Sequence, residues 1–163
     1  MFKHQRYNIE NTTAMKIEQV IKQNKPFPNV HERALVNLLY TTNWLRDRMS
    51  HFLKPFGITI QQYNVLRILG GAKQPISTST IRERLLDKMS DTSRMVNRLH
   101  QKGLVNRTAC AKDKRLVDVS LSEKGTQLLA SVAQHNDRLG NLLSGLDQSE
   151  VLLLNDILDK IRG

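Results

Sequence analysis

The sequence predicts a mainly α-helical fold with one small β-hairpin, an α+β arrangement within 163 residues. Apolar residues recur at helical spacing through most of the chain, which is the primary signal of amphipathic helices. Two short segments, 104–108 and 116–121, instead alternate apolar and polar residues as half-buried strands do. Serine, threonine or aspartate precedes most helical segments, where these residues cap a helix N-terminus.

A short helix and then a long one are predicted in the N-terminal part. The short helix lies within Thr13–Gln23, and two prolines after it prevent its continuation. The long helix should run from about Val30 to Leu53 and end at Pro55-Phe-Gly57. Thr59-Ile-Gln-Gln62 then forms a capping box for a third helix, which Gly70-Gly71 closes. The apolar stripe of the long helix consists of Ala34, Leu35, Leu38, Leu39, Leu45, Met49, Phe52 and Leu53.

Two short helices joined by a tight turn come next, in a helix-turn-helix pattern. Ser77 is expected to cap the first of them and Ser90 the second, which runs from Asp91 to Gln101 and ends at Gly103. The first helix is expected to bury Ile81, Leu85 and Leu86. The second is expected to bury Met95, Val96 and Leu99.

The two alternating segments enclose a polar, basic loop, residues 109–115, that is long enough to protrude. A hairpin directly after a helix-turn-helix is the wing of a winged helix. Ser122 should cap a long helix after this wing, and Asp147-Gln-Ser-Glu150 should open a last one. The long helix is expected to continue through Leu128, Leu129, Val132, Leu139 and Leu142. Both helices are leucine-rich, which predicts a helical dimerisation layer.

The positive charge is concentrated. The chain carries a formal net charge of +10, and ten basic residues but only four acidic ones lie between Thr78 and Arg115. Residues 122–163 hold four basic and six acidic side chains. A basic segment of this kind attracts a polyanion such as nucleic acid. Charge alone is equally compatible with a solvated basic face.

Two motifs connect these elements to a known family. The segment Asp113-Lys-Arg-Leu-Val-Asp-Val-Ser-Leu-Ser-Glu-Lys-Gly125 is similar to the pattern D-x-R-x-x-x-V-x-L-T-x-x-G, and it differs only at Ser122, where threonine is usual. Either residue caps a helix. Ser93–Leu99 and Lys102–Arg107 resemble a recognition helix and the entry to a wing strand. From Val30 to the C-terminus the chain thus resembles the MarR family of bacterial winged-helix transcription regulators.

The resemblance implies a homodimer with two winged helix-turn-helix lobes that binds a pseudopalindromic operator in double-stranded DNA. It also implies release of the operator by a small phenolic or other lipophilic effector, or by an oxidant. The predicted domains are N-terminal helices of the dimerisation layer at 1–58, the DNA-binding lobe at 59–121, and C-terminal helices of the dimerisation layer at 122–163.

The outward face of the 91–101 helix should enter the major groove, where base edges match hydroxyl, amide and guanidinium groups. Arg94 can bond a guanine edge, and Arg98 should meet a phosphate. Arg115 in the wing suits a narrow minor groove, with Asp113 orienting its guanidinium. The predicted DNA-binding residues are Ser79, Thr80, Arg82, Ser90, Asp91, Ser93, Arg94, Asn97, Arg98, Lys112, Asp113, Lys114 and Arg115.

The resemblance further implies an effector pocket where the interface layer meets the DNA-binding lobe. Aromatic residues with a few polar groups at such a boundary suit an amphipathic ligand, although plain packing between lobes explains the same residues. Cys110 lies near Lys112, whose charge favours a reactive thiolate, but a spectator cysteine is the simpler interpretation. The predicted pocket residues are Trp44, Arg48, His51, Tyr63 and Arg67.

Other classes of protein find less support. The longest aliphatic run, Val151–Leu154, is too short to span a bilayer, and the polar N-terminus does not resemble a secretion signal. A single cysteine fits a reducing cytoplasm. The five histidines show no metal-ligand spacing, and no nucleophile or phosphate-loop motif occurs, so we expect no metal, no cofactor and no enzymatic activity. The alternative function is a winged-helix module that binds protein or RNA.

Overall fold

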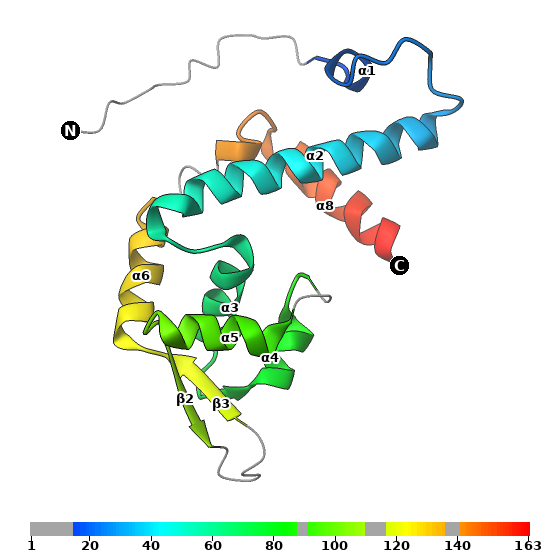
Figure 1. Ribbon diagram of the computed structural model, residues 1–163. Helices are drawn as coiled ribbons and strands as arrows, with labels where there is room; N and C mark the ends of the chain where they lie inside the picture. Colours follow the sequence, from blue (N-terminus) through cyan, green and yellow to red (C-terminus); the bar gives the residue numbers. More distant parts are fainter. Residues whose placement is uncertain (1–14, 88–90, 110–116, 136–140) are drawn as a thin grey trace, which may run out of the picture. The chain divides into compact units, whose positions relative to one another are not determined.

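Helices account for most of the chain in the computed structural model, together with a small antiparallel sheet (Figure 1). The structure describes residues 15–87, 91–109, 117–135 and 141–163. Its helices are α1 (Ile17–Val20), α2 (Val30–Leu53), α3 (Ile60–Gly70), α4 (Thr78–Arg84), α5 (Thr92–Gln101), α6 (Glu123–Ala133) and α8 (Gln148–Arg162), with 3-10 turns η1 (Lys54–Phe56) and η2 (Asn141–Leu143). Its strands are β1 (Ile76–Ser77), β2 (Val105–Ala109) and β3 (Val117–Leu121). The mainly helical fold with a hairpin is thus confirmed.

The chain divides into two compact units, residues 1–44 and 45–163, with the boundary inside α2. In the first unit, α1 comprises only four residues, so the helix expected within Thr13–Gln23 is much shorter than predicted. Lys22 has φ of 54°, a left-handed conformation that cannot continue a helix. The Arg33 guanidinium donates to the Glu18 carboxylate at 2.5 Å and holds the pKa of that carboxyl below its usual range.

The second unit contains the helix-turn-helix and a sheet in the order β1-β3-β2. Strands β2 and β3 form the predicted hairpin, with Val105 opposite Leu121 and Ala109 opposite Val117. Strand β1 was not predicted, because two residues are too few to show an alternating pattern. It pairs Ile76 with Val119 and thereby places the start of α4 against the hairpin.

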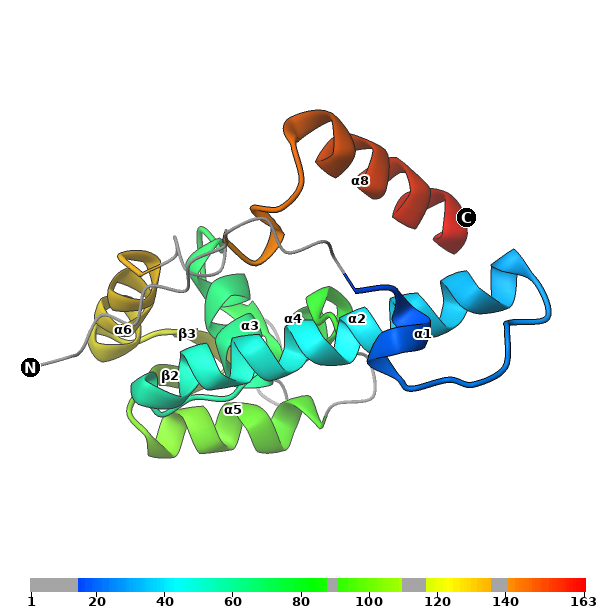
Figure 2. The same ribbon diagram turned by 90° about the horizontal axis from the view of Figure 1, so that it is seen from above.

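One hydrophobic core, with residues from Leu53 to Val132, joins the helices α3 to α6 and the sheet of this unit. Helix α3 contacts α4, α5, α6 and β3, so most of the elements pack around it (Figures 1 and 2). The capping box that opens α3 is present, with the Thr59 hydroxyl accepting from the Gln62 N–H at 3.2 Å. Among the described residues, the largest fully buried side chains are Leu53, Leu66, Ile81, Leu99, Val65, Val96, Val105, Val119 and Val132.

Leu86 does not pack in the core as predicted. Ile81 and Leu85 are buried, but Leu86 is 86% exposed. Helix α4 ends at Arg84, and Leu85 has extended backbone angles, φ −65° and ψ 140°. An extended residue breaks the helical phase, so the side chain that follows Leu85 points away from the core.

The helix after the wing is also shorter than predicted. Ser122 caps α6 as expected, but the helix ends at Ala133 instead of continuing through Leu142, which lies in the turn η2. The segment Gln134-His-Asn-Asp137 has no apolar side chain to bury, so the periodicity that α6 begins is interrupted there. Leu139 lies outside the described residues. Helix α8 opens at the predicted capping box, with Asp147 accepting from the Glu150 N–H at 2.9 Å.

The start of α6 is docked on the backbone of Leu104. The Leu104 carbonyl accepts from the Ser122 N–H at 3.1 Å, and the Ser122 hydroxyl donates to the Gly103 carbonyl at 2.7 Å while accepting from the Gly125 N–H at 3.0 Å. Gly103 has φ of 70°, which glycine adopts at little cost. A Cβ on Gly125 would lie 2.1 Å from the Leu104 oxygen. Only glycine therefore permits this approach.

Gly125→Ala should destabilise the protein by about 2 kcal/mol or more, because either α6 or the Leu104 backbone must move. Urea unfolding followed by circular dichroism at fixed protein concentration measures this change. Gly145→Ala is the matched control, since a Cβ there would contact nothing within 4 Å. Equal stabilities for the two variants would contradict the docking of α6 described above.

Candidate nucleic-acid interface

Helix α5 has one buried face and one exposed face. Met95, Val96 and Leu99 are buried, as the sequence predicted, and Thr92 is buried as well. Hydroxyl, amide and guanidinium groups, which bond base edges and phosphates, lie on the other face. These exposed residues are Ser93, Arg94, Asn97 and Arg98. The core does not use them, so the exposed face of α5 is the candidate interface.

Asp91, and not Ser90, caps α5. The Asp91 carboxylate accepts from the backbone N–H of Arg94 at 2.9 Å, and the helix begins at Thr92. The prediction of Ser90 as the cap is therefore wrong, and its predicted DNA contact lies outside the described residues. Serine and aspartate are about equally good N-caps, so the sequence does not distinguish two adjacent candidates. Asp91 thus has a structural role as the cap of α5.

Hydroxyl groups gather at the start of α4. Ser77 caps this helix as predicted, because its Oγ accepts from the Thr80 N–H at 3.2 Å. The same Oγ lies 2.7 Å from the Ser79 Oγ and 3.0 Å from the Thr80 Oγ1. Ser79 and Arg82 are exposed, and Thr80 is half-buried. The first turns of α4 therefore hold the three predicted phosphate contacts close together in sequence and in space.

One contact on the α5 face was not predicted. The Arg107 guanidinium, on β2, donates to the Asn97 Oδ1 at 2.5 Å. The sequence contained a signal for it, because Arg107 is two residues beyond the buried Val105 and so starts on the same face of the strand. Arg107 thus belongs to the candidate interface, although we did not predict it there.

The predicted wing contacts belong to the loop between β2 and β3. Lys112, Asp113, Lys114 and Arg115, together with Cys110, lie outside the described residues. Their segment connects Ala109 and Val117, which are paired across the hairpin. The role of the wing stays a prediction.

The predicted effector residues occupy different environments. Tyr63 is buried in the core, and the Arg67 guanidinium lies 5.9 Å from the centre of its ring. His51 is exposed, and its Nδ1 lies 2.8 Å from the Asp47 carbonyl oxygen. Arg48 is exposed too, and Trp44 belongs to the first unit. The effector pocket stays a prediction.

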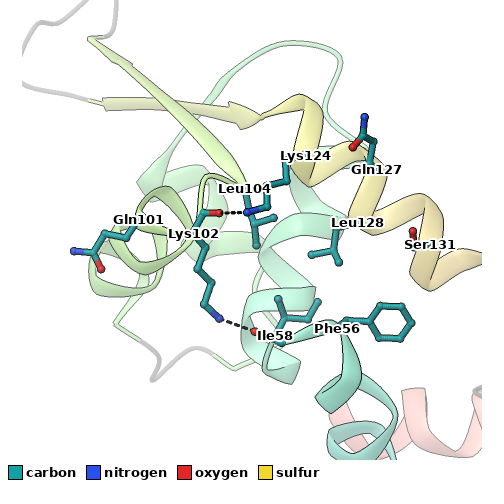
Figure 3. A pocket seen from close by; sticks show the side chains of 10 residues that line it. Phe56, Ile58, Gln101, Lys102, Leu104, Lys124, Gln127, Leu128 and Ser131 are labelled. Atoms are coloured by element: carbon teal, nitrogen blue, oxygen red, sulfur yellow. Dashed lines mark hydrogen bonds between the residues drawn. The ribbon is translucent and has the colours of Figure 1, made fainter.

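A shallow groove of about 550 Å³ lies elsewhere in the second unit, between residues 56–58 ahead of α3, the end of α5 and α6 (Figure 3). The Lys102 ammonium donates to the Gly57 carbonyl at 2.6 Å and to the Gln62 Oε1 at 3.1 Å. The Lys124 ammonium donates to the Lys102 carbonyl at 3.0 Å (Figure 3). None of the predicted effector residues lines this groove. Its two lysines connect the C-terminal end of α5 to its neighbours.

Two further features are absent from the described part of the chain. No group of three or more histidine, cysteine, aspartate or glutamate side chains there is placed to hold a metal ion. No helix there is long and apolar enough to cross a membrane.

A helix-turn-helix followed by a hairpin that packs on its second helix defines a winged helix-turn-helix domain. The family model described as MarR family matches residues 56–116. The chain is also 31% identical over 118 residues to the HTH-type transcriptional repressor MdtR of Bacillus subtilis, covering 72% of this chain and 76% of that relative. The chain therefore belongs to the MarR family of transcription regulators, and we call α5 its recognition helix.

Solved structures show the same fold. A mutant MarR from E. coli in complex with operator DNA is 29% identical, with a TM-score of 0.70 over 78% of this chain and 93% of that one. AbsC, a MarR family transcriptional regulator from Streptomyces coelicolor, is 22% identical, with a TM-score of 0.73 over 85% and 95%.

The cap on the recognition helix can be tested directly. Asp91→Ala should destabilise the protein by about 1 kcal/mol, because the Arg94 N–H loses its acceptor. Asp91→Asn retains an acceptor oxygen and should stay within a few tenths of a kcal/mol of the parent. Urea unfolding measures both changes. An Asp91→Asn variant that is as unstable as Asp91→Ala would show that the capping oxygen is not what Asp91 contributes.

Proposed function

We propose that this protein is a homodimeric transcription repressor that binds a pseudopalindromic operator in double-stranded DNA. The observation that carries the proposal is the recognition helix, whose exposed face presents Ser93, Arg94, Asn97 and Arg98. Two relatives support it: the B. subtilis protein is named a transcriptional repressor, and the E. coli MarR was crystallised with operator DNA. The basic surplus between residues 78 and 115 adds a non-specific attraction to the phosphates.

The proposed DNA contacts fall into two chemical classes, contacts to base edges and contacts to phosphates. Arg94 lies in the first turn of α5 and suits the N7 and O6 acceptors of guanine. Arg98, one turn later, suits a phosphate, as do Ser79, Thr80 and Arg82 at the start of α4. Arg115, supported by Asp113 in the wing, suits a narrow minor groove. The base contacts then determine which DNA sequence the protein prefers. The phosphate contacts determine the register of the protein on the duplex.

The proposed dimer is based on apolar side chains that a single chain leaves exposed. Soluble monomers seldom expose many large apolar side chains. Burial against a second copy of the chain is therefore the simplest explanation for them. On α2 these side chains are Val30, Leu35, Leu38, Leu39, Tyr40 and Trp44. On α8 they are Leu152, Leu153, Ile157 and Ile161.

Release of the operator by a small aromatic or lipophilic effector, or by an oxidant, is part of the same proposal. The candidates for the first route are residues whose aromatic and polar groups suit an amphipathic ligand, namely Trp44, Arg48, His51, Tyr63 and Arg67. Cys110, close in sequence to Lys112, is the candidate for the second. A winged-helix module that binds protein or RNA is the alternative, and the DNA-binding test below distinguishes the two.

The test of DNA binding compares the region upstream of the gene with a random duplex of equal length. We expect affinity about 10³-fold or more higher for the upstream region and a steep dependence on salt. Arg94→Ala should cost about 1–3 kcal/mol on that region and relax discrimination at the bases it contacts. Lys25→Ala removes one charge outside the interface and is the control. Equal affinity for both duplexes would favour the alternative module.

The dimer predicts a sedimenting mass twice the 18.7 kDa of one chain at micromolar concentration. Leu153→Lys should shift the protein to monomer, because it buries a charge in the proposed interface. Asn155→Lys adds the same charge to α8 about half a turn away and should leave the dimer intact. A parent protein that sediments as a stable monomer would contradict the proposal.

A further inference from the structure

Arg107 and Asn97 connect the wing strand β2 to the reading face of the recognition helix. The distance from the guanidinium nitrogen of Arg107 to the Asn97 Oδ1 is 2.5 Å, which is short for a hydrogen bond to a neutral acceptor. Both residues are exposed. Asn97 lies between Arg94 and Arg98 on the outward face of α5, where base edges would be read.

The sheet explains how Arg107 reaches this position. Arg107 is directly opposite Val119 in the β2–β3 pair, and Val119 is fully buried. Directly opposed residues in an antiparallel pair point to the same face of the sheet, so Arg107 starts on the face that covers the core. Helix α5 packs against β2 on that side (Figure 1). The long arginine side chain then extends from the edge of the core to the surface and meets Asn97 there.

The chemistry of this pair fixes the orientation of the Asn97 amide. A guanidinium group carries only donors, so it can bond only the oxygen of the amide. The Asn97 oxygen is therefore held toward Arg107, and the NH₂ group retains both of its protons for another partner. A free asparagine could instead present its oxygen and its NH₂ together, which is the arrangement that bonds N6 and N7 of adenine.

We propose that Arg107 is a positioning residue that turns Asn97 into a donor-only reader of the major groove. The inference rests on the proposed function, because it requires the recognition helix to lie in that groove. A donor-only amide favours bases that present acceptors there, guanine through N7 and O6 or thymine through O4. It loses the bidentate advantage on adenine, and it rejects cytosine, whose N4 is a donor.

A different role for Arg107 makes a different prediction. If its charge served only to contact a phosphate, removing it would weaken binding about equally on every sequence and lower the salt slope by about one. A positioning role instead changes which base is preferred at one position. Arg107→Lys should behave like the parent in either role, because a lysine ammonium keeps the charge and also carries only donors. It is therefore the matched control for Arg107→Ala.

The experiment selects bound duplexes from a pool of randomised double-stranded DNA, using the full chain and its variants. Asn97→Ala identifies the position that Asn97 reads, as the position at which base preference is lost. At that position the parent and Arg107→Lys should enrich guanine or thymine. Arg107→Ala frees the amide, and the ratio of adenine to guanine or thymine should rise about fivefold or more. In Asn97→Asp, the carboxylate can still accept from Arg107 but has no donor to offer a base. It should therefore enrich cytosine, whose N4 is a donor.

The outcomes are distinct. An Arg107→Ala profile that matches the parent at the Asn97 position, with only lower affinity overall, overturns the inference and leaves the proposed function standing. An Asn97→Ala profile that matches the parent at every position also overturns it, since Asn97 then reads no base. If the parent enriches no sequence at all, the proposed function fails and the inference fails with it. Circular dichroism of each variant verifies that the fold is retained.

Discussion

The backbone carbonyl of Leu104 is the point on which the packing of the winged helix-turn-helix depends. It accepts from the Ser122 N–H, and Gly125 approaches it so closely that no side chain fits between them. Leu104 directly follows the turn that ends α5 and directly precedes β2, whereas Ser122 directly follows β3. One carbonyl thus joins the end of the recognition helix, both wing strands and the start of α6. The close approach explains why residue 125 is a glycine. The hydroxyl of Ser122, which donates to the Gly103 carbonyl and accepts from the Gly125 N–H, explains why a hydroxyl residue caps α6.

The recognition helix is consequently fixed at both ends while its outer face stays unoccupied by the core. At its start, Asp91 satisfies the Arg94 N–H. At its end, the Lys102 ammonium bonds the Gly57 carbonyl, and Lys124 bonds the Lys102 carbonyl. Rigid support of this kind lets a helix present side chains at defined spacing, which base readout requires. The contact from Arg107 extends the same principle from the helix to one of its side chains.

Local patterns predicted the elements that local chemistry controls. The long helix Val30–Leu53, the caps Thr59, Ser77 and Ser122, and the two strands of the hairpin all follow from apolar spacing and from side chains that bond the nearby backbone. The failures occur where a neighbouring residue competes or where the pattern is too short. Ser90 and Asp91 are both good caps, and β1 has only two residues.

The sequence by itself determined the helix-turn-helix, the wing strands, the concentration of basic charge and the outward face of α5, because helical and strand periods assign each side chain to a face. Only the tertiary structure decided that Leu86 is exposed and that Arg107 meets Asn97. The exposure of the Leu86 side chain follows from the extended backbone of Leu85, which the spacing of apolar residues does not reveal. The Arg107 contact depends on the register of two strands and on how the recognition helix packs on their inner face. Such distances between elements are fixed by core packing and not by any single segment of the chain.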